Sequence, residues 1–150
     1  MSELRELYQE IILDHNKNPR NFGMLEKSNA HAQGHNPLCG DQIEIYANVR
    51  NGRIEELKFR ALGCAISTAS GSLMTECVVG KTVAEADELF ESFHHLVTEG
   101  EIPEVHEEEM EGLYALAGVK DFPIRVKCAT LAWHTLRAAL HDSETRISTE

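Results

Sequence analysis

One dipeptide, Asn51-Gly52, limits most strongly what this chain can fold into. The residues before it, 41–49, alternate apolar with polar side chains, and residues 54–61 after it alternate in the same way. Alternation with a period of two is typical of a strand with one buried face. Asn-Gly supplies the two positive φ angles that a type I′ turn needs. The sequence therefore predicts an antiparallel hairpin that turns at Asn51-Gly52.

Helical periodicity predicts that helices accompany this hairpin. Apolar residues recur at helical spacing in four segments, which are 3–16, 67–79, 82–97 and 124–141. The third segment opens with Thr82 and Glu85, which fit a capping box. The Gly, Pro and Asn pairs of residues 17–40 predict a loop, the acidic residues 99–112 a solvated loop or helix start, and residues 112–118 a short helix. We expect an α+β domain, with helices packed on one face of a small antiparallel sheet of about three strands.

Length and charge restrict the organisation of the chain and its partners. A length of 150 residues favours a single domain, with a flexible tail over the polar residues 142–150. The net charge of −11 disfavours nucleic acid and anionic membrane surfaces as partners. No apolar run reaches the length of a membrane span, and the first residues lack the features of a secretory signal. We therefore expect a cytoplasmic protein, in which thiols stay reduced.

Three of the four cysteines stand at the ends of predicted elements. Cys39 lies in the loop that leads into the first strand, Cys64 follows the second strand, and Cys128 lies near the start of the last helix. An antiparallel hairpin places the start of its first strand beside the end of its second. We therefore expect Cys39, Asp41 and Cys64 to lie close together, at the end of the hairpin opposite the turn.

These residue types suit a metal site or a reactive thiol. Thiolates bind soft or borderline metals, and Asp41 with the three cysteines would supply the four ligands of a tetrahedral site. Arg125, Lys127 and the N-terminus of the last helix would offset the negative charge near Cys128. The loop histidines His31 and His35 are further candidate ligands. Cysteines that only pack in the core remain the alternative, and helical spacing favours it for Cys77.

Three segments, in this order, resemble the IscU/SufU family of iron–sulfur cluster assembly proteins, a NifU N-terminal-type domain. They are Asn36-Pro37-Leu38-Cys39-Gly40-Asp41, Gly63-Cys64-Ala65-Ile66-Ser67 and Arg125-Val126-Lys127-Cys128. The segment from Leu7-Tyr8 to Phe22-Gly23 resembles the N-terminal helix and loop of the family, so the match covers about residues 4–140. Lys127 replaces the histidine of the IscU branch, and an extra stretch precedes the final helix at about residues 99–118. Both features resemble the SufU branch.

The resemblance implies a zinc site formed by Cys39, Asp41, Cys64 and Cys128. It also implies a pyridoxal-phosphate-dependent, SufS-like cysteine desulfurase as partner, with Cys39 as the acceptor of persulfide sulfur. Arg125 would steady the anionic sulfur or Asp41. Downstream assembly proteins or apo-proteins would receive what the chain carries.

Three alternatives stay open at this point. The same four ligands could instead hold a transient [2Fe–2S] cluster, which would make the chain a scaffold. The zinc could be purely structural, in which case the chain would carry out no sulfur chemistry. Finally, His35 or a residue of a partner could compete with Asp41 for the metal.

Overall fold

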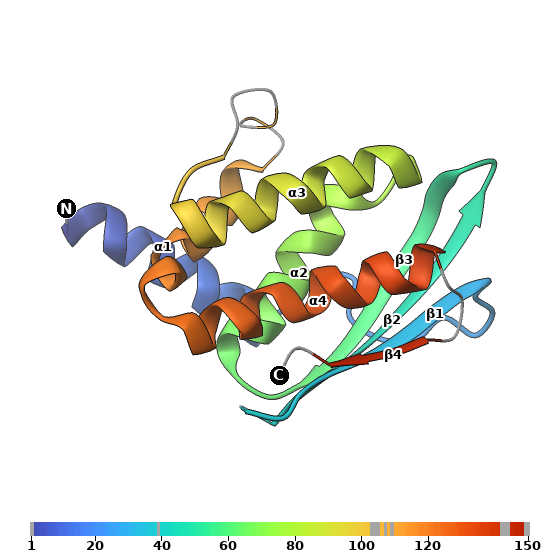
Figure 1. Ribbon diagram of the computed structural model, residues 1–150, viewed down its shortest axis with the longest axis horizontal. Coiled ribbons are helices and arrows are strands. Elements are labelled where there is room, and N and C mark those ends of the chain that lie inside the picture. The colour runs from blue at the N-terminus through green and yellow to red at the C-terminus, as the bar shows by residue number, and fades with distance from the viewer. Residues whose placement is uncertain are drawn as a thin grey trace.

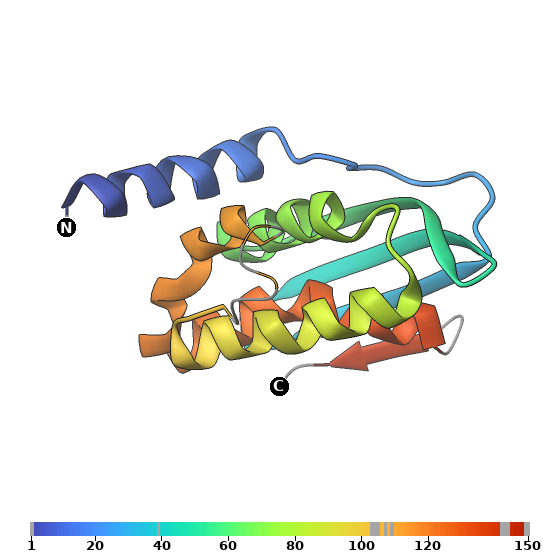
Figure 2. The same cartoon turned by 90° about the horizontal axis from the view of Figure 1, so that it is seen from above.

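The computed structural model describes residues 2–38, 40–102, 106, 108, 110–141 and 145–148. Its four-stranded sheet has the order β3-β2-β1-β4, and helices cover one face of it (Figures 1 and 2). In chain order the elements are α1 (Ser2–Lys17), β1 (Ala30–Asn36), β2 (Asp41–Arg50), β3 (Arg53–Leu62), α2 (Ala65–Val78), α3 (Val83–Glu99), the 3₁₀ helix η2 (Glu111–Asp121), α4 (Pro123–His141) and β4 (Thr145–Ser148). None of the helices in these ranges is long and apolar enough to cross a membrane.

The predicted hairpin is confirmed in β2 and β3. The strands pair antiparallel, with Ile45 opposite Phe59, and both of these side chains are fully buried. Asn51 and Gly52 have φ angles of 52° and 75°, the positive values that the type I′ turn requires. At the other end of the hairpin, the start of β2 lies beside the end of β3, and α2 begins directly after that point.

The predicted loop over residues 17–40 is wrong for β1, Ala30–Asn36, which pairs antiparallel with β2. Alternate β1 residues are buried, and α4 packs against this strand. The packing is so close that a Cβ atom added at Gly34 would overlap Thr135 Oγ1. Ala, Gly and Asn are depleted in strands in general, so local propensity opposes a strand here, and packing against α4 decides in its favour.

The helices follow their sequence signals closely. The capping box of Thr82 and Glu85 is present at the start of α3, and α4 begins at Pro123 as expected for proline in a first turn. The predicted short helix forms as η2, which packs against α1 and α3. The stretch before it is only partly a solvated loop, because Ile102 and Met110 are buried in the core. Residues 103–105, 107 and 109 of that stretch lie outside the described residues.

Residues 145–148 form β4, where the sequence predicts a flexible tail over residues 142–150. The strand pairs parallel with β1, from Ala32 opposite Thr145 to His35 opposite Ser148. Without β4, this side of β1 would expose unpaired N–H and C=O groups at a sheet edge, which favours pairing with a further segment. Four residues of the predicted tail thus pair with β1, and the other residues of that tail lie outside the described residues.

A buried histidine joins α1 and the segment after it to α2. His15 is 7% exposed, and its Nδ1 lies 2.6 Å from Ser72 Oγ. The same hydroxyl oxygen accepts a hydrogen bond of 2.8 Å from the Arg20 backbone N–H. Burial lowers the pKa of His15, and the positive charge of Arg20 lowers it further. The structure therefore buries this imidazole, at the end of α1, against α2.

Candidate metal centre

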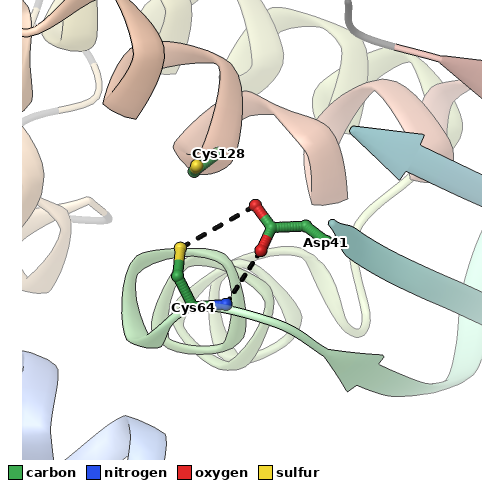
Figure 3. Close-up of side chains that lie close together, drawn as sticks. All are labelled: Asp41, Cys64 and Cys128. Atoms are coloured by element: carbon green, nitrogen blue, oxygen red, sulfur yellow. Dashed lines mark hydrogen bonds between the residues drawn. The ribbon is translucent and has the colours of Figure 1, made fainter. Parts of the chain in front are cut away.

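Three elements meet at the end of the hairpin opposite its turn, and each contributes one side chain to a cluster (Figure 3). Asp41 is the first residue of β2, Cys64 is the N-cap of α2, and Cys128 lies in the second turn of α4. One carboxylate oxygen and the two sulfur atoms all lie within 4.8 Å of one another. The structure thus brings together three of the four side chains that the sequence analysis singles out.

Asp41 is fully buried, and the backbone around Cys64 is shaped to meet it. Asp41 Oδ1 accepts a hydrogen bond of 2.8 Å from the Cys64 backbone N–H, and the Cys64 thiol lies 3.8 Å from Asp41 Oδ2 (Figure 3). Gly63, with a φ of 140°, lies in the region that favours glycine. A Cβ atom added at Gly63 would overlap Asp41 Oδ1 and lie 2.8 Å from Asp41 Cα. The glycine therefore allows the chain to pass close to the carboxylate before α2 begins.

Cys128 is also fully buried, and it has a polar neighbour that was not predicted from the sequence to belong to the site. Asn36, the last residue of β1, donates a hydrogen bond from Nδ2 to Cys128 Sγ over 3.6 Å. Its Oδ1 accepts a hydrogen bond of 3.2 Å from the Leu38 backbone N–H. In the sequence, Asn36-Pro37 indicates only a break between elements. A buried role for this amide becomes visible once β1 is in place.

The donor set fits a divalent metal such as zinc. Among the described residues, the buried Asp41 carboxylate accepts its hydrogen bonds from Cys64 and forms no ion pair with a cationic side chain. A buried carboxylate without a compensating cation is costly. Two sulfur donors beside it are ligands that zinc commonly takes, and the N-terminus of α2 also favours negative charge here. The cluster therefore suits a cation held by Asp41, Cys64 and Cys128.

Cys39, the fourth candidate, lies outside the described residues. Its neighbours on either side, Leu38 and Gly40, are exposed, and Leu38 is 58% exposed. Gly40 has a φ of 72°, so the chain turns sharply just before Asp41 begins β2. Whether Cys39 completes the site stays a prediction.

The structure places the remaining candidates away from the cluster. His35 is exposed and His31 half-buried, and both alternate along β1 with the residues that face the core. His31 Nε2 lies 3.2 Å from Glu44 Oε2, and its ring stacks on Tyr46, at the outer side of the sheet. Neither histidine belongs to a cluster of metal-ligating groups in the described part of the chain.

The two basic residues before Cys128 and the remaining cysteine occupy different environments. Arg125 is exposed in the first turn of α4, and Lys127 is half-buried. The role of Arg125 in steadying the anionic sulfur or Asp41 stays a prediction. Cys77 is buried in the hydrophobic core, as its helical spacing predicts.

Comparisons with protein families, curated relatives and solved structures all indicate the same family. The family model described as the NifU-like N terminal domain matches residues 7–150. The iron–sulfur cluster assembly scaffold protein IscU of Streptococcus pyogenes serotype M1 is 41% identical over 143 residues, which cover 95% of this chain and 88% of that protein. The zinc-dependent sulfurtransferase SufU of Bacillus subtilis (strain 168) is 36% identical over 143 residues, 95% of either chain. A crystal structure from Fervidobacterium islandicum AW-1, described as a cluster assembly scaffold for the SUF system, has a TM-score of 0.81 at 34% identity and covers 91% of this chain and 98% of that one.

Proposed function

This chain belongs to the NifU-like N-terminal domain family of iron–sulfur cluster assembly proteins, which includes IscU and SufU, and on that premise we propose that it is a zinc-bound sulfur acceptor. It takes persulfide sulfur from a pyridoxal-phosphate-dependent cysteine desulfurase and passes that sulfur on. The relative named as a zinc-dependent sulfurtransferase matches this chain along nearly its whole length, which supports the proposal.

The donor set of the cluster is the observation that carries the proposal. Asp41, Cys64 and Cys128 bring a buried carboxylate and two sulfur atoms within 4.8 Å of one another. In this proposal they hold the zinc together with Cys39. Bound zinc would keep the coordinating thiols deprotonated, because a metal-bound thiolate has lost its proton.

Cys39 is the residue to which we assign the transfer. Its exposed neighbours would let a partner reach it, whereas Cys128 is fully buried. As in thiol–disulfide exchange, the Cys39 thiolate attacks the terminal sulfur of the desulfurase persulfide. A bond forms between Cys39 Sγ and that sulfur, the bond between the two desulfurase sulfurs breaks, and its electron pair leaves on the desulfurase cysteine as thiolate. Arg125, exposed at the start of α4, would steady the anionic sulfur.

A scaffold for a transient [2Fe–2S] cluster is the second candidate. The Streptococcus pyogenes relative carries the scaffold name at 41% identity, and the same donors could bind iron. Lys127 favours the first candidate. It stands directly before Cys128, at the position where the IscU branch of the family has a histidine. A carboxylate ligand such as Asp41 would suit either a labile cluster or an exchangeable zinc site.

The experiment compares three proteins purified without oxygen: the wild type, Cys39→Ser and the matched control Cys77→Ala. We expect about one zinc per chain in the wild type, no visible chromophore, and faster cysteine consumption when the protein is added to a desulfurase. Cys39→Ser should lose that stimulation and Cys77→Ala should keep it. Unchanged stimulation by Cys39→Ser would remove Cys39 as the acceptor.

The metal analysis of the same preparations separates the two candidates. Iron and sulfide in equal amounts, with a brown chromophore, would make the scaffold the correct assignment. In that case, Asp41→Ala should prolong the life of the reconstituted cluster.

A further inference from the structure

Asn36 connects two parts of the metal centre that are far apart in the sequence. Its Nδ2 donates to Cys128 Sγ over 3.6 Å, and its Oδ1 accepts from the Leu38 backbone N–H over 3.2 Å. One amide side chain therefore contacts both the sulfur on α4 and the backbone N–H of Leu38. The two contacts use the two different ends of the carboxamide, so one substitution can remove one without the other.

The position of Asn36 in the fold restricts the groups that its amide can contact. Asn36 is the last residue of β1, it lies opposite Asp41 in the strand register, and it is fully buried. The other inward-facing residues of β1 are small, Ala30, Ala32 and Gly34, and α4 packs closely over them. Asparagine is the exception in this row, and a buried amide is retained only when its hydrogen bonds are made. Here one bond is made to the Cys128 sulfur of the metal centre and the other to the Leu38 backbone N–H.

A hydrogen bond from an amide to a thiolate changes the properties of that sulfur. The bond stabilises the negative charge on the sulfur, which lowers its basicity, and low dielectric strengthens the effect at a buried site. Partners of this kind orient metal ligands and tune their affinity. Of the two described cysteines of the centre, Cys64 is half-buried, whereas Cys128 is fully buried beside Asn36.

We propose that Asn36 is a positioning residue of the metal centre. It holds the Cys128 sulfur by a hydrogen bond, and it couples this sulfur to the turn at Leu38. Cys128 is thereby fixed as the permanent ligand, and the same amide also holds the backbone at Leu38. This inference rests on the proposed metal-binding function and adds a residue that acts through a ligand, without contacting the metal.

The test uses Zn²⁺ and Co²⁺ binding to the full chain and three variants. Asn36→Ala removes both hydrogen bonds, and Asn36→Asp keeps an oxygen for the Leu38 N–H but removes the donor to Cys128. Asn29→Ala is the matched control, because Asn29 also bonds through its side chain, to Val49, just before the other end of β1. We expect both Asn36 variants to bind zinc about 10–100-fold more weakly, with the control unchanged. Their thiolate-to-cobalt charge-transfer band should move to lower energy, because the sulfur loses its hydrogen bond.

A measurement on the wild type decides the question even where an Asn36 variant does not fold. With NMR-active cadmium and nitrogen isotopes, the Asn36 side-chain amide should show a through-bond coupling to the bound cadmium across Cys128 Sγ. No coupling at Asn36 would overturn the inference, and so would wild-type affinity and band position in a folded Asn36 variant. A wild type that binds neither zinc nor cobalt would instead overturn the proposed function, so the two failures are distinct.

Discussion

Replacing Asp41 by asparagine separates the metal-binding role of this carboxylate from its role in the fold. Asn is nearly isosteric with Asp, and its Oδ1 can still accept the hydrogen bond of 2.8 Å from the Cys64 backbone N–H. The substitution removes a buried negative charge that, within the described part of the chain, has no cationic partner. Without metal, we therefore expect Asp41→Asn to unfold at a temperature no lower than the wild type.

With zinc present, we expect Asp41→Asn to be less stable than the wild type, and the size of this difference can be estimated. Free zinc at about 100 times Kd stabilises a folded protein by about 2.7 kcal/mol. For a chain of 150 residues, each kcal/mol raises Tm by about 2–4 °C, so zinc should raise the wild-type Tm by about 5–11 °C. Loss of an outer-shell partner already weakens metal binding by up to about 100-fold. If loss of the direct ligand Asp41 weakens binding by at least that factor, the same zinc stabilises the variant by no more than about 0.4 kcal/mol, which raises Tm by no more than about 1–2 °C.

Differential scanning calorimetry, with and without zinc, measures both effects in one series. Asp87→Asn is the control, because Asp87 contacts His141 on the surface, outside the cluster, and should keep the wild-type response. An Asp41→Asn variant that keeps the full zinc-induced rise in Tm would refute the reasoning. Asp41 would then be only the acceptor for the Cys64 N–H.

Two further predictions concern the fold that supports the centre. Gly34→Ala should destabilise the protein by about 1–3 kcal/mol in urea unfolding, because the added methyl group overlaps Thr135 Oγ1. Adding Thr135→Ala to the same chain should recover part of this loss. A Gly34→Ala variant as stable as the wild type would contradict the close packing of α4 on β1. Burial lowers the pKa of His15 in the folded state, so its contribution to stability is present above pH 6.5 and is lost as the pH falls below that value. Urea unfolding between pH 7.5 and pH 5.5 should therefore show a smaller loss of stability for His15→Gln than for the wild type, and parallel losses would remove His15 as the cause.

The elements that could be predicted from the sequence are those whose signals are local. Asn51-Gly52 sets the two positive φ angles of its turn, and the alternation on either side sets the register of β2 and β3. Thr82 and Glu85 satisfy each other's backbone N–H groups within one turn of α3. Each of these signals involves residues that are close in the chain, so no knowledge of the remaining packing is needed.

The candidate site likewise combines a contact that follows from local sequence signals with one that does not. The meeting of Asp41 with Cys64 follows from the hairpin register, because the start of β2 must lie beside the end of β3. The approach of Cys128 depends on how α4 crosses β1 and β2, which no periodicity within α4 determines. For Cys128, the sequence offers a residue type at a helix start, and only the resemblance to a family places it in the site.

Strand β1 shows why the contact between Asn36 and Cys128 could not be predicted from the sequence. Its inward-facing residues are small because α4 lies directly on them, and small residues are the ones that give a strand no local signal. The close packing that hides the strand in the sequence also brings Asn36 to Cys128 at its end. A search for further residues of this kind should therefore begin at inward-facing polar residues of weakly signalled strands, since burial there requires a partner that the sequence does not reveal.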